Sequence, residues 1–434
     1  MERFNYSKEI QVKGEYDVLI CGGGPGGIGA AISSAENGSK TILVEKLGFL
    51  GGLATAGLVN PMCEFGYEGI RVTGGIPYGF ANELIKADGA MFEPPKMNLS
   101  FNPEKYKLVA QRMILSAGVE LLTNTSLVDC IVKDGNIVSC IFHNRDGLFA
   151  IKAKCFVDAT GDAFLASMAG VPMLEDTRPK QPGSLCFKMA GVDTQSPRMH
   201  IIHQKNNHFN HQAVFIREVL EKLEAEGKEV PQYGGPWLCT TMNPGEITLN
   251  FTRSAMDCTK QDSFTKAEQK MLEDVFILSE MIRKHVPEFK EAYVSQIAPV
   301  AGARQGRRIA GLFVMTGEDY IKGTRFEDSI ARACHPVDVH LPNNQGQSLT
   351  FPERAAFIPY RCLVSNAIDN LLMAGRAISV DEDAFAAVRV QAPCMEIGQA
   401  AGVAASLAVK ENTTVQNIDV TKLVEIVKSY GSFV

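Results

Sequence analysis

The chain has 434 residues, with 43 basic and 49 acidic side chains and a net charge of −6. This length predicts about two or three domains, and a hydrophobic content of 45% provides enough apolar side chains to form their cores. Because no run of Lys or Arg is present, we expect no nucleic-acid or membrane partner. No apolar segment has the length and composition of a signal peptide or a membrane span. We therefore expect a cytoplasmic chain, whose oligomeric state the sequence leaves open.

The eleven cysteines stand at irregular spacings without a CxxC pair. An odd number of scattered cysteines in a long chain predicts buried free thiols, rather than disulfides, zinc or an iron–sulfur cluster. Four of the eight histidines fall within residues 200–211, in a polar segment without neighbouring carboxylates. We interpret this segment as a solvated loop or a lid, and we expect no metal site.

The first recognisable unit is a strand, a glycine-rich turn, a helix and a second strand. The apolar run 16–21 ends at Gly22, and an Ala-rich helix continues to about Glu36. A second strand at 41–44 then ends on Glu45. This order predicts a βαβ unit whose strands are parallel and buried.

The turn of this unit has the GxGxxG pattern, in which each glycine has its own physical reason. Gly22 permits the tight turn, Gly24 lets the backbone approach a pyrophosphate, and Gly27 lets the helix pack closely on the strand. The helix N-terminus offers unpaired N–H groups to phosphate, and a carboxylate at Glu45 can accept hydrogen bonds from ribose hydroxyls. The alternative is a structural glycine turn. The predicted dinucleotide-binding residues here are Gly22, Gly24, Pro25, Gly26, Gly27, Glu45 and Lys46.

Two later segments indicate that the dinucleotide is FAD. Helices at about 78–86 and 103–118 precede strands at 119–122, 126–133, 136–143 and 149–157, which we interpret as a β-meander. The last strand ends at 158–162, where FAD enzymes of this type return to the nucleotide. The alternatives are an ordinary turn at 158–162 and a flexible loop at 51–55. The residues predicted to contact FAD are Gly51, Gly52, Ala54, Thr55, Ala159, Thr160, Gly161 and Asp162.

Residues 171–355 have a different character. Strand-like runs at 184–189 and 246–251 alternate with a helix at 212–226 and a helix beginning near Thr265. Glu268 would complete a capping box with Thr265. We predict an inserted, mixed α+β substrate domain between a first FAD-binding segment, 1–170, and a return segment, 356–434.

The return segment supplies the third FAD anchor. A buried strand over 370–376 ends in Gly375 and Arg376, and a helix opens at Pro393. The N-terminus of that helix would stabilise negative charge on a reduced flavin, and small residues would permit a close approach. The alternative is plain helix packing. The residues predicted here are Gly375, Arg376, Arg389, Gly398 and Ala400.

On the substrate side we select histidines and arginines. His335 or His340 could act as acid or base, or polarise a carbonyl group. The guanidinium forks of Arg304 and Arg308 suit a substrate carboxylate. The alternative for each is a structural hydrogen bond or ion pair.

With these motifs the sequence resembles the FAD-dependent oxidoreductases related to the flavoprotein subunits of fumarate reductase and heterodisulfide reductase, and more distantly to thiazole synthases. The matching segments are VLICGGGPGGIGAA, TILVEK, GGLATAGLV, FVDATGD, ARQGRRIAG and NLLMAGRAIS. The resemblance implies an α/β, Rossmann-like FAD domain of the glutathione-reductase type, with the flavin facing the inserted domain. No histidine follows Glu45 where a histidyl-linked flavin would require one, so we expect FAD to be bound non-covalently.

The resemblance implies hydride transfer between FAD and a small polar substrate, which the arginines suggest carries a carboxylate. Electrons would be exchanged with NAD(P)H or with an electron-transfer protein. Two alternatives stay open. The chain could be an electron-transfer subunit that needs a partner, or a non-redox nucleotide-binding enzyme of the thiazole-synthase type.

Overall fold

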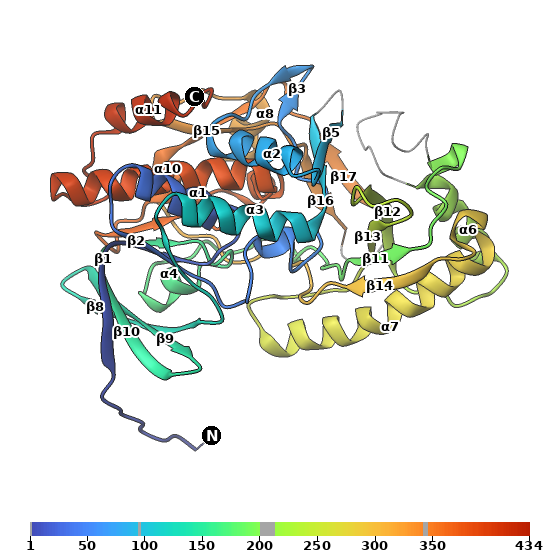
Figure 1. Cartoon of the computed structure of the whole chain (residues 1–434), viewed down its shortest axis with the longest axis horizontal. Coiled ribbons are helices and arrows are strands. Elements are labelled where there is room, and N and C mark those ends of the chain that lie inside the picture. Colours follow the sequence, from blue (N-terminus) through green and yellow to red (C-terminus); the bar gives the residue numbers. More distant parts are fainter. Residues whose placement is uncertain (1, 94–96, 200–212, 342–345) are drawn as a thin grey trace.

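The computed structural model describes residues 2–93, 97–199, 213–341 and 346–434. Two β-sheets, each with its own helices, form the body of the protein (Figure 1). The helices are α1 Pro25–Glu36, α2 Gly75–Lys86, α3 Pro103–Ser116, α4 Phe164–Met168, α6 Val214–Ala225, α7 Gln261–His285, α8 Gly317–Lys322, α9 Glu382–Val388, α10 Gln391–Glu411 and α11 Val420–Ser429. Short 3-10 turns at Gly52–Ala54, Pro287–Phe289 and Tyr360–Leu363 join some of these elements.

The larger sheet contains the predicted βαβ unit. Its strands are β1 Gln11–Cys21, β2 Thr41–Val44, β7 Glu120–Leu122, β8 Ser126–Lys133, β9 Asn136–Asn144, β10 Gly147–Asp158 and β19 Leu371–Met373. The order is β7-β2-β1-β10-β9-β8, and β19 pairs with the end of β10. The pairs from β7 to β10, and the β10–β19 pair, are parallel, whereas β8, β9 and β10 form an antiparallel meander. The predicted FAD-binding fold with a β-meander is therefore confirmed.

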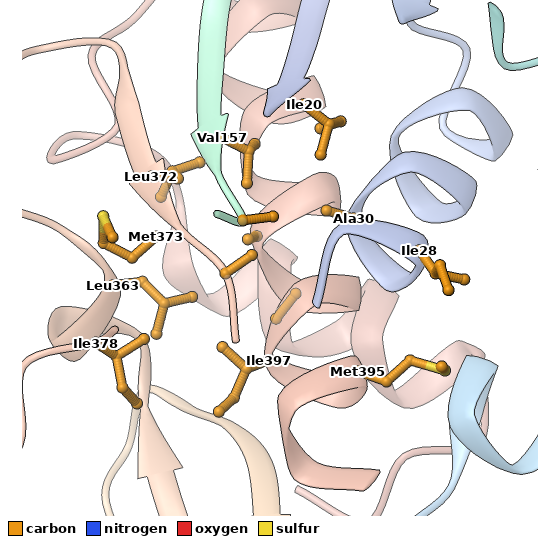
Figure 2. Close-up of a cluster of buried hydrophobic side chains, with 14 of the residues drawn as sticks. Ile20, Ile28, Ala30, Val157, Leu363, Leu372, Met373, Ile378, Met395 and Ile397 are labelled. Atoms are coloured by element: carbon orange, nitrogen blue, oxygen red, sulfur yellow. The ribbon is translucent and has the colours of Figure 1, made fainter. Parts of the chain in front are cut away.

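Two chain segments far apart in sequence complete the parallel part of this sheet. Ile20 of β1, Val157 of β10 and Leu372 of β19 lie near Ala30 of α1 (Figure 2). All four side chains are buried in one hydrophobic core. The carboxyl ends of three parallel strands therefore meet at one edge, next to the beginning of α1. In α/β sheets, ligands bind at such an edge.

The hairpin turn of the meander has the predicted residues. Asp134 and Gly135 both adopt positive φ, at 50° and 77°. Two left-handed residues make the turn that matches the twist of antiparallel strands. The sequence signal for this turn is therefore confirmed.

The second sheet has the strand order β12-β13-β11-β14 and is antiparallel. Its strands are β11 Phe187–Ala190, β12 Tyr233–Thr240, β13 Ile247–Thr252 and β14 Tyr293–Ile297. With α6 and α7 it encloses a second hydrophobic core made by residues 185–303 and by Leu58. Most buried hydrophobic residues from Ile309 onwards belong to the first core, whereas Cys334 and Ala355 form a small third cluster with Val72. The boundaries of 171 and 355 for an inserted domain stay a prediction.

Four small two-stranded sheets complete the described chain. Their strands are β3 Gly66–Tyr67 with β4 Ile70–Arg71, β5 Ala90–Glu93 with β6 Asn98–Phe101, β15 Ser329–Ala333 with β18 Ala356–Pro359, and β16 Val337–His340 with β17 Gln347–Thr350.

Some predicted helix starts are wrong. α7 begins at Gln261, not near Thr265, and no side chain caps it. The Glu268 carboxylate accepts a hydrogen bond from Ala301 N–H at 2.9 Å instead of closing a capping box. α2 begins at Gly75 and α10 at Gln391. Pro393 lies inside the first turn of α10, where its missing N–H removes no helix hydrogen bond.

α10 is the only helix, in the part of the chain described, that has the length and hydropathy of a membrane span. Of its apolar window, 94% is buried inside the protein. α10 packs along α1 (Figure 1). It is accordingly the central core helix of the first domain. The histidine-rich segment 200–211 lies outside the described residues.

Candidate active site

The three glycines of the first turn have three different surroundings. A Cβ on Gly22 would lie 2.5 Å from the Ala159 carbonyl oxygen, and Gly22 has φ of +105°. A Cβ on Gly27 would lie 1.8 Å from the Gly22 oxygen. A Cβ on Gly24, by contrast, meets only the Gly52 Cα at 3.8 Å. Gly22 and Gly27 are therefore required by packing, whereas Gly24 leaves open space at the N-terminus of α1.

A second glycine pair closes this space from the other side. Gly51 and Gly52 adopt φ of +113° and +53°. Gly51 N–H donates to the Gly23 carbonyl at 2.8 Å, and a Cβ on Gly52 would lie 2.9 Å from the Gly24 Cα. The predicted residues Gly24 and Gly52 are thus brought together and leave backbone exposed to a ligand. Of the other two predicted residues, Ala54 is buried and the Thr55 hydroxyl donates to the Leu50 carbonyl.

Glu45 supports the loop from below. Its carboxylate accepts hydrogen bonds from Gly23 N–H at 2.6 Å and from Leu47 N–H at 2.8 Å. Burial raises the pKa of Glu45, while these N–H donors act in the opposite direction. Glu45 therefore fixes the position of the glycine loop. Its hydrogen bonds to ribose stay a prediction, and Lys46 next to it is exposed.

Two charged side chains fix the turn after β10, the buried carboxylate of Asp158 and the guanidinium group of Arg376. Asp158 is fully buried and accepts hydrogen bonds from Thr160 and Ala166. Arg376 donates to the Gly161 carbonyl and to Asp162, in each case at 2.8 Å. The structure therefore brings the predicted residues Gly161, Asp162 and Arg376 together. Their contacts with one another are structural.

Gly398 and Ala400 pack α10 against α1. A Cβ on Gly398 would lie 1.9 Å from the Gly26 carbonyl oxygen, and a Cβ on Gly26 would lie 2.7 Å from the Gly375 nitrogen. Ala400 is fully buried. The helix-packing interpretation accounts for these residues, which set how closely the two helix N-termini approach.

Gln391 at the start of α10 is a residue that the site prediction did not include. Its amide Nε2 donates to the Val59 carbonyl at 2.7 Å. Its Oε1 is buried and has no hydrogen-bond partner among the residues that the structure describes. A buried amide oxygen without a donor is costly, and a ring N–H of a bound ligand would satisfy it.

These features fit a flavin dinucleotide. The glycine space at the N-terminus of α1 suits the pyrophosphate, and the open acceptor at the N-terminus of α10 suits a ring with N–H groups. Residues 51–59 connect the two places and end at the Val59 carbonyl that holds Gln391.

A group of charged residues adjoins the loop of residues 51–59, because Val300, four residues before Arg304, donates its N–H to the Ala56 carbonyl. Arg304 donates to the Pro182 carbonyl at 2.7 Å and to the Ser184 hydroxyl at 2.9 Å. Arg389 donates to the Arg304 carbonyl at 3.0 Å and to the Asp338 carbonyl at 3.0 Å. Burial, and then the charge of Arg253, lower the pKa of Arg304 to about 9; burial lowers the pKa of Arg389 to about 10.

His340 belongs to the same group. Its Nε2 lies 3.0 Å from Asp338 Oδ2, and its backbone N–H donates to Gln181 Oε1 at 3.0 Å. Burial, followed by the positive charge of Arg304, lowers the pKa of His340 to about 3. The imidazole is therefore neutral at physiological pH, and with the Asp338 carboxylate as partner it carries its proton on Nε2.

Two other predicted catalytic residues have different surroundings. His335 Nδ1 lies 2.9 Å from the Pro336 carbonyl. Arg308 is buried, pairs with Asp176 at 2.6 Å and donates to the Val380 carbonyl at 2.9 Å. These contacts give Arg308 a structural role that joins two chain segments. His335 stands two residues before β16, the strand that carries Asp338 and His340.

Arg253, which the sequence prediction missed, belongs to the Arg304 group. Its Nη1 donates to Ser184 and to Asn250 Oδ1, the same two side chains to which Arg304 donates. Arg253 follows β13, and no local motif marks it. Gly183 pairs with Ser254, and Ser184 pairs with Gly302. Only these two pairings bring Arg253 next to Arg304.

Residues 17–427 match the family described as FAD dependent oxidoreductase. The chain belongs to this family. It is therefore a flavoprotein enzyme, and the dinucleotide that the glycine space fits is FAD.

Among curated relatives, digeranylgeranylglycerophospholipid reductase of Methanocaldococcus jannaschii is 26% identical over 200 residues, which cover 42% of this chain and 48% of the relative. Thiamine thiazole synthase of Methanococcus vannielii is 32% identical over 167 residues, covering 35% and 59%. The chain spans about half the length of the curated relatives that it matches. They agree with the predicted resemblance to thiazole synthases, but do not support one to fumarate or heterodisulfide reductase.

Among solved structures, a geranylgeranyl bacteriochlorophyll reductase-like protein of Thermoplasma acidophilum has a TM-score of 0.48 and 14% sequence identity. The match covers 96% of this chain and 83% of that protein.

Proposed function

We propose that this oxidoreductase transfers a hydride between FAD, bound non-covalently, and a small polar substrate that carries a carboxylate. The observation that carries the proposal is a continuous set of contacts between two parts of the site. These are the loop of residues 51–59, which would bind FAD, and the arginine group, which consists of Arg253, Arg304 and Arg389. Val300 N–H donates to the Ala56 carbonyl at 3.2 Å, four residues before Arg304. Gln391 and Arg389, two residues apart, contact Val59 and Arg304 respectively.

Each charged residue then has a definable part. FAD, when bound, supplies the capacity to accept or donate a hydride. Arg304 and Arg389 place positive charge where a substrate carboxylate can be bound and oriented. Neutral His340 is held in one orientation by Asp338 and is a poor base, because its pKa of about 3 is far from neutral pH. Its one N–H is donated to Asp338, so its other ring nitrogen, Nδ1, is suited to accept a hydrogen bond from a substrate hydroxyl or amide group.

The test is a comparison of acids with their neutral analogues. FAD-saturated protein would be mixed anaerobically with saturated and 2-hydroxy carboxylic acids, and the chemically reduced protein with unsaturated carboxylic acids. We expect at least one acid to change the flavin spectrum, while its methyl ester or amide reacts at least about tenfold more slowly, a loss of about 1.4 kcal/mol. Equal rates with acid and ester would contradict a carboxylate-binding site.

The electron partner is a separate part of the proposal. We propose that NAD(P)H or an electron-transfer protein exchanges electrons with the flavin, and that the enzyme works in the cytoplasm. Anaerobic addition of NADH and then NADPH would test the first partner through bleaching of the flavin bands. A flavin that stays oxidised with both nucleotides, but is reduced chemically, would instead support a partner protein.

A second candidate comes from the relatives. Digeranylgeranylglycerophospholipid reductases match over about two fifths of this chain, so reduction of such a lipid is the alternative reaction. Reduction of digeranylgeranylglycerophospholipid by the chemically reduced protein, with no reaction of small acids, would favour this function over the one proposed. Co-purification of an adenylated product in place of FAD would favour chemistry of the thiazole-synthase type.

A further inference from the structure

Arg253 and Arg304 are two buried cations that share neutral partners. Both donate to the Ser184 hydroxyl and to Asn250 Oδ1, at 2.9 Å and 3.3 Å for the two bonds to Asn250. Two guanidinium groups that bind the same small acceptors must lie close together. Like charges at short range repel each other, and an anion between or beside them offsets this repulsion.

The carboxylate nearest to this pair is already engaged. Asp338 accepts from the His340 ring at 3.0 Å and lies 3.7 Å from Arg389. Since His340 is neutral, the group holds three arginines against one aspartate in its described part. Burying positive charge without a counterion is unfavourable, and in proteins such charges are paired or bind a ligand.

One donor of this group is left without an acceptor. Arg253 is 2% exposed, and its Nη2 has no hydrogen-bond partner among the described residues. The guanidinium plane lies against the backbone of Gly234, where a Cβ would be 2.4 Å from Nε. Glycine at this position therefore makes room for the arginine. The fold therefore fixes the position of Arg253, although its hydrogen bonds within the described residues are to neutral acceptors.

Part of the group is open to solvent. Arg304, Arg389, Asn250 and Trp237 are each partly exposed, while Arg253 is buried. Trp237 on β12 pairs with Asn250 on β13, the residue that accepts from both arginines. A small anion that reaches the partly exposed Arg304 would therefore also lie near the buried Arg253, which shares its two partners.

We propose that Arg253 and Arg304 together bind one carboxylate group of the substrate, with Arg253 as its buried anchor. This inference deepens the proposed function and rests on it, since it names the two residues that hold the acid group. The two guanidinium groups suit a carboxylate better than a neutral amide, because charge-assisted hydrogen bonds to an anion are stronger than those to a neutral acceptor. Mutual repulsion of the two cations is relieved when the anion binds.

The experiment is a titration of the FAD-saturated protein with sodium malonate, followed by the fluorescence of Trp237, the single tryptophan. We expect saturable binding of malonate and none of malonamide. Arg253→Gln should weaken malonate binding at least about tenfold, and Arg253→Lys, which keeps the charge but loses the fork, should be intermediate. Both variants should retain FAD as the natural chain does.

Arg198→Gln is the matched control. Arg198 has the same chemistry, lies in the same part of the chain and pairs with Glu288 through a half-exposed side chain. This variant should bind malonate like the natural chain. Malonate binding that is unchanged in Arg253→Gln, or equally weakened in Arg198→Gln, would overturn the inference.

Failure of the inference can be told apart from failure of the proposed function. Malonate binding that depends on Arg253, in a protein whose flavin reacts with no acid, would support the site but not the reaction. A flavin that reacts with acids at the same KM in Arg253→Gln would support the reaction and overturn the role of Arg253. If Arg253→Gln does not fold, Arg304→Gln and Arg253→Lys provide the same comparison.

Discussion

In the glycine-rich turn before α1, some glycines are required by packing and others leave room for a ligand. Gly24 has extended backbone angles, φ of −73° and ψ of −177°, that any residue can adopt, and its Cβ direction is open. Gly27 has no such freedom, because the Gly22 carbonyl occupies the position of a Cβ. The two glycines look alike in sequence but should respond differently to the same substitution.

We predict that Gly24→Ala folds normally and loses FAD. Its free energy of unfolding without FAD should change by less than about 0.5 kcal/mol, while its Kd for FAD should rise at least about tenfold. Gly27→Ala should instead fail to fold, or unfold at much lower temperature, with or without FAD. Flavin titration and thermal unfolding of both variants measure this. Unchanged FAD affinity in Gly24→Ala would contradict the assignment of the glycine space at the N-terminus of α1 to the pyrophosphate.

Glu396 is a buried carboxylate in α10 that accepts N–H bonds from Arg332 and Gly74. Burial raises the pKa of Glu396 to about 7 in the folded protein, from its ordinary value of 4.5. The folded state therefore holds a proton that the unfolded chain has lost. The contribution to stability is fully present below about pH 4.5 and is lost as the pH rises to about 7.

Glu396→Gln should remove this dependence. The natural chain should lose about 3 kcal/mol of unfolding free energy from this group between pH 4.5 and pH 8, and the variant should not. Urea unfolding of both proteins at pH 5.5 and pH 8 gives the comparison. A difference between the two proteins that is the same at both pH values would contradict the raised pKa.

Residue-scale prediction from sequence succeeds where a motif fixes the geometry. The glycines of the loop and the Asp134-Gly135 turn follow from backbone conformation, which neighbours in sequence determine. Arg253 could not be selected in this way. Its partner Arg304 is about fifty positions away, and only the pairing of strand ends places them together.

At the level of elements, α1 and α10 are the pair that holds the first domain. Their backbones touch, since a Cβ on Gly402 would lie 2.1 Å from the Ala30 carbonyl and a Cβ on Gly29 would lie 2.2 Å from the Met395 carbonyl. Small residues at these points permit a close crossing of two buried helices. This crossing fixes the start of α10, with Gln391, relative to the start of α1.

We predict opposite effects for two glycine-to-alanine changes in helices. Gly402→Ala should destabilise the protein by about 1–3 kcal/mol or more, because the added methyl group meets backbone. Gly79→Ala in α2 should be neutral or stabilise it by up to about 1 kcal/mol, since nothing lies within 4 Å of its Cβ position. Chemical unfolding of the two variants tests this. A loss of stability in Gly79→Ala as large as in Gly402→Ala would contradict it.

Element positions were predictable to the extent that local signals decide them. The βαβ unit and the meander follow from buried runs and turns, and they appear as expected. The start of α7 was misplaced because Thr265 and Glu268 form the pattern of a capping box, while Glu268 binds the backbone of Ala301 instead. A contact from a distant segment overrides the local signal here.

At the level of the whole molecule, the candidate site lies where the two hydrophobic cores meet. Leu50 and Ala54 belong to the first core, whereas Leu58, only a few residues later, belongs to the second. The loop of residues 51–59 therefore runs from one core to the other, and residues 300–304 return beside it. This arrangement brings Arg304, which follows Ala303 of the second core, to the same loop as the glycine space beside α1.

The most direct test of this account is the visible spectrum of the protein after incubation with FAD and desalting, recorded again after acid precipitation. We predict flavin bands that remain with the native protein, and a yellow supernatant over a colourless precipitate. Flavin retained in the precipitate would contradict non-covalent binding. A protein that keeps no flavin through desalting would contradict the central claim that the glycine cradle and the start of α10 bind FAD.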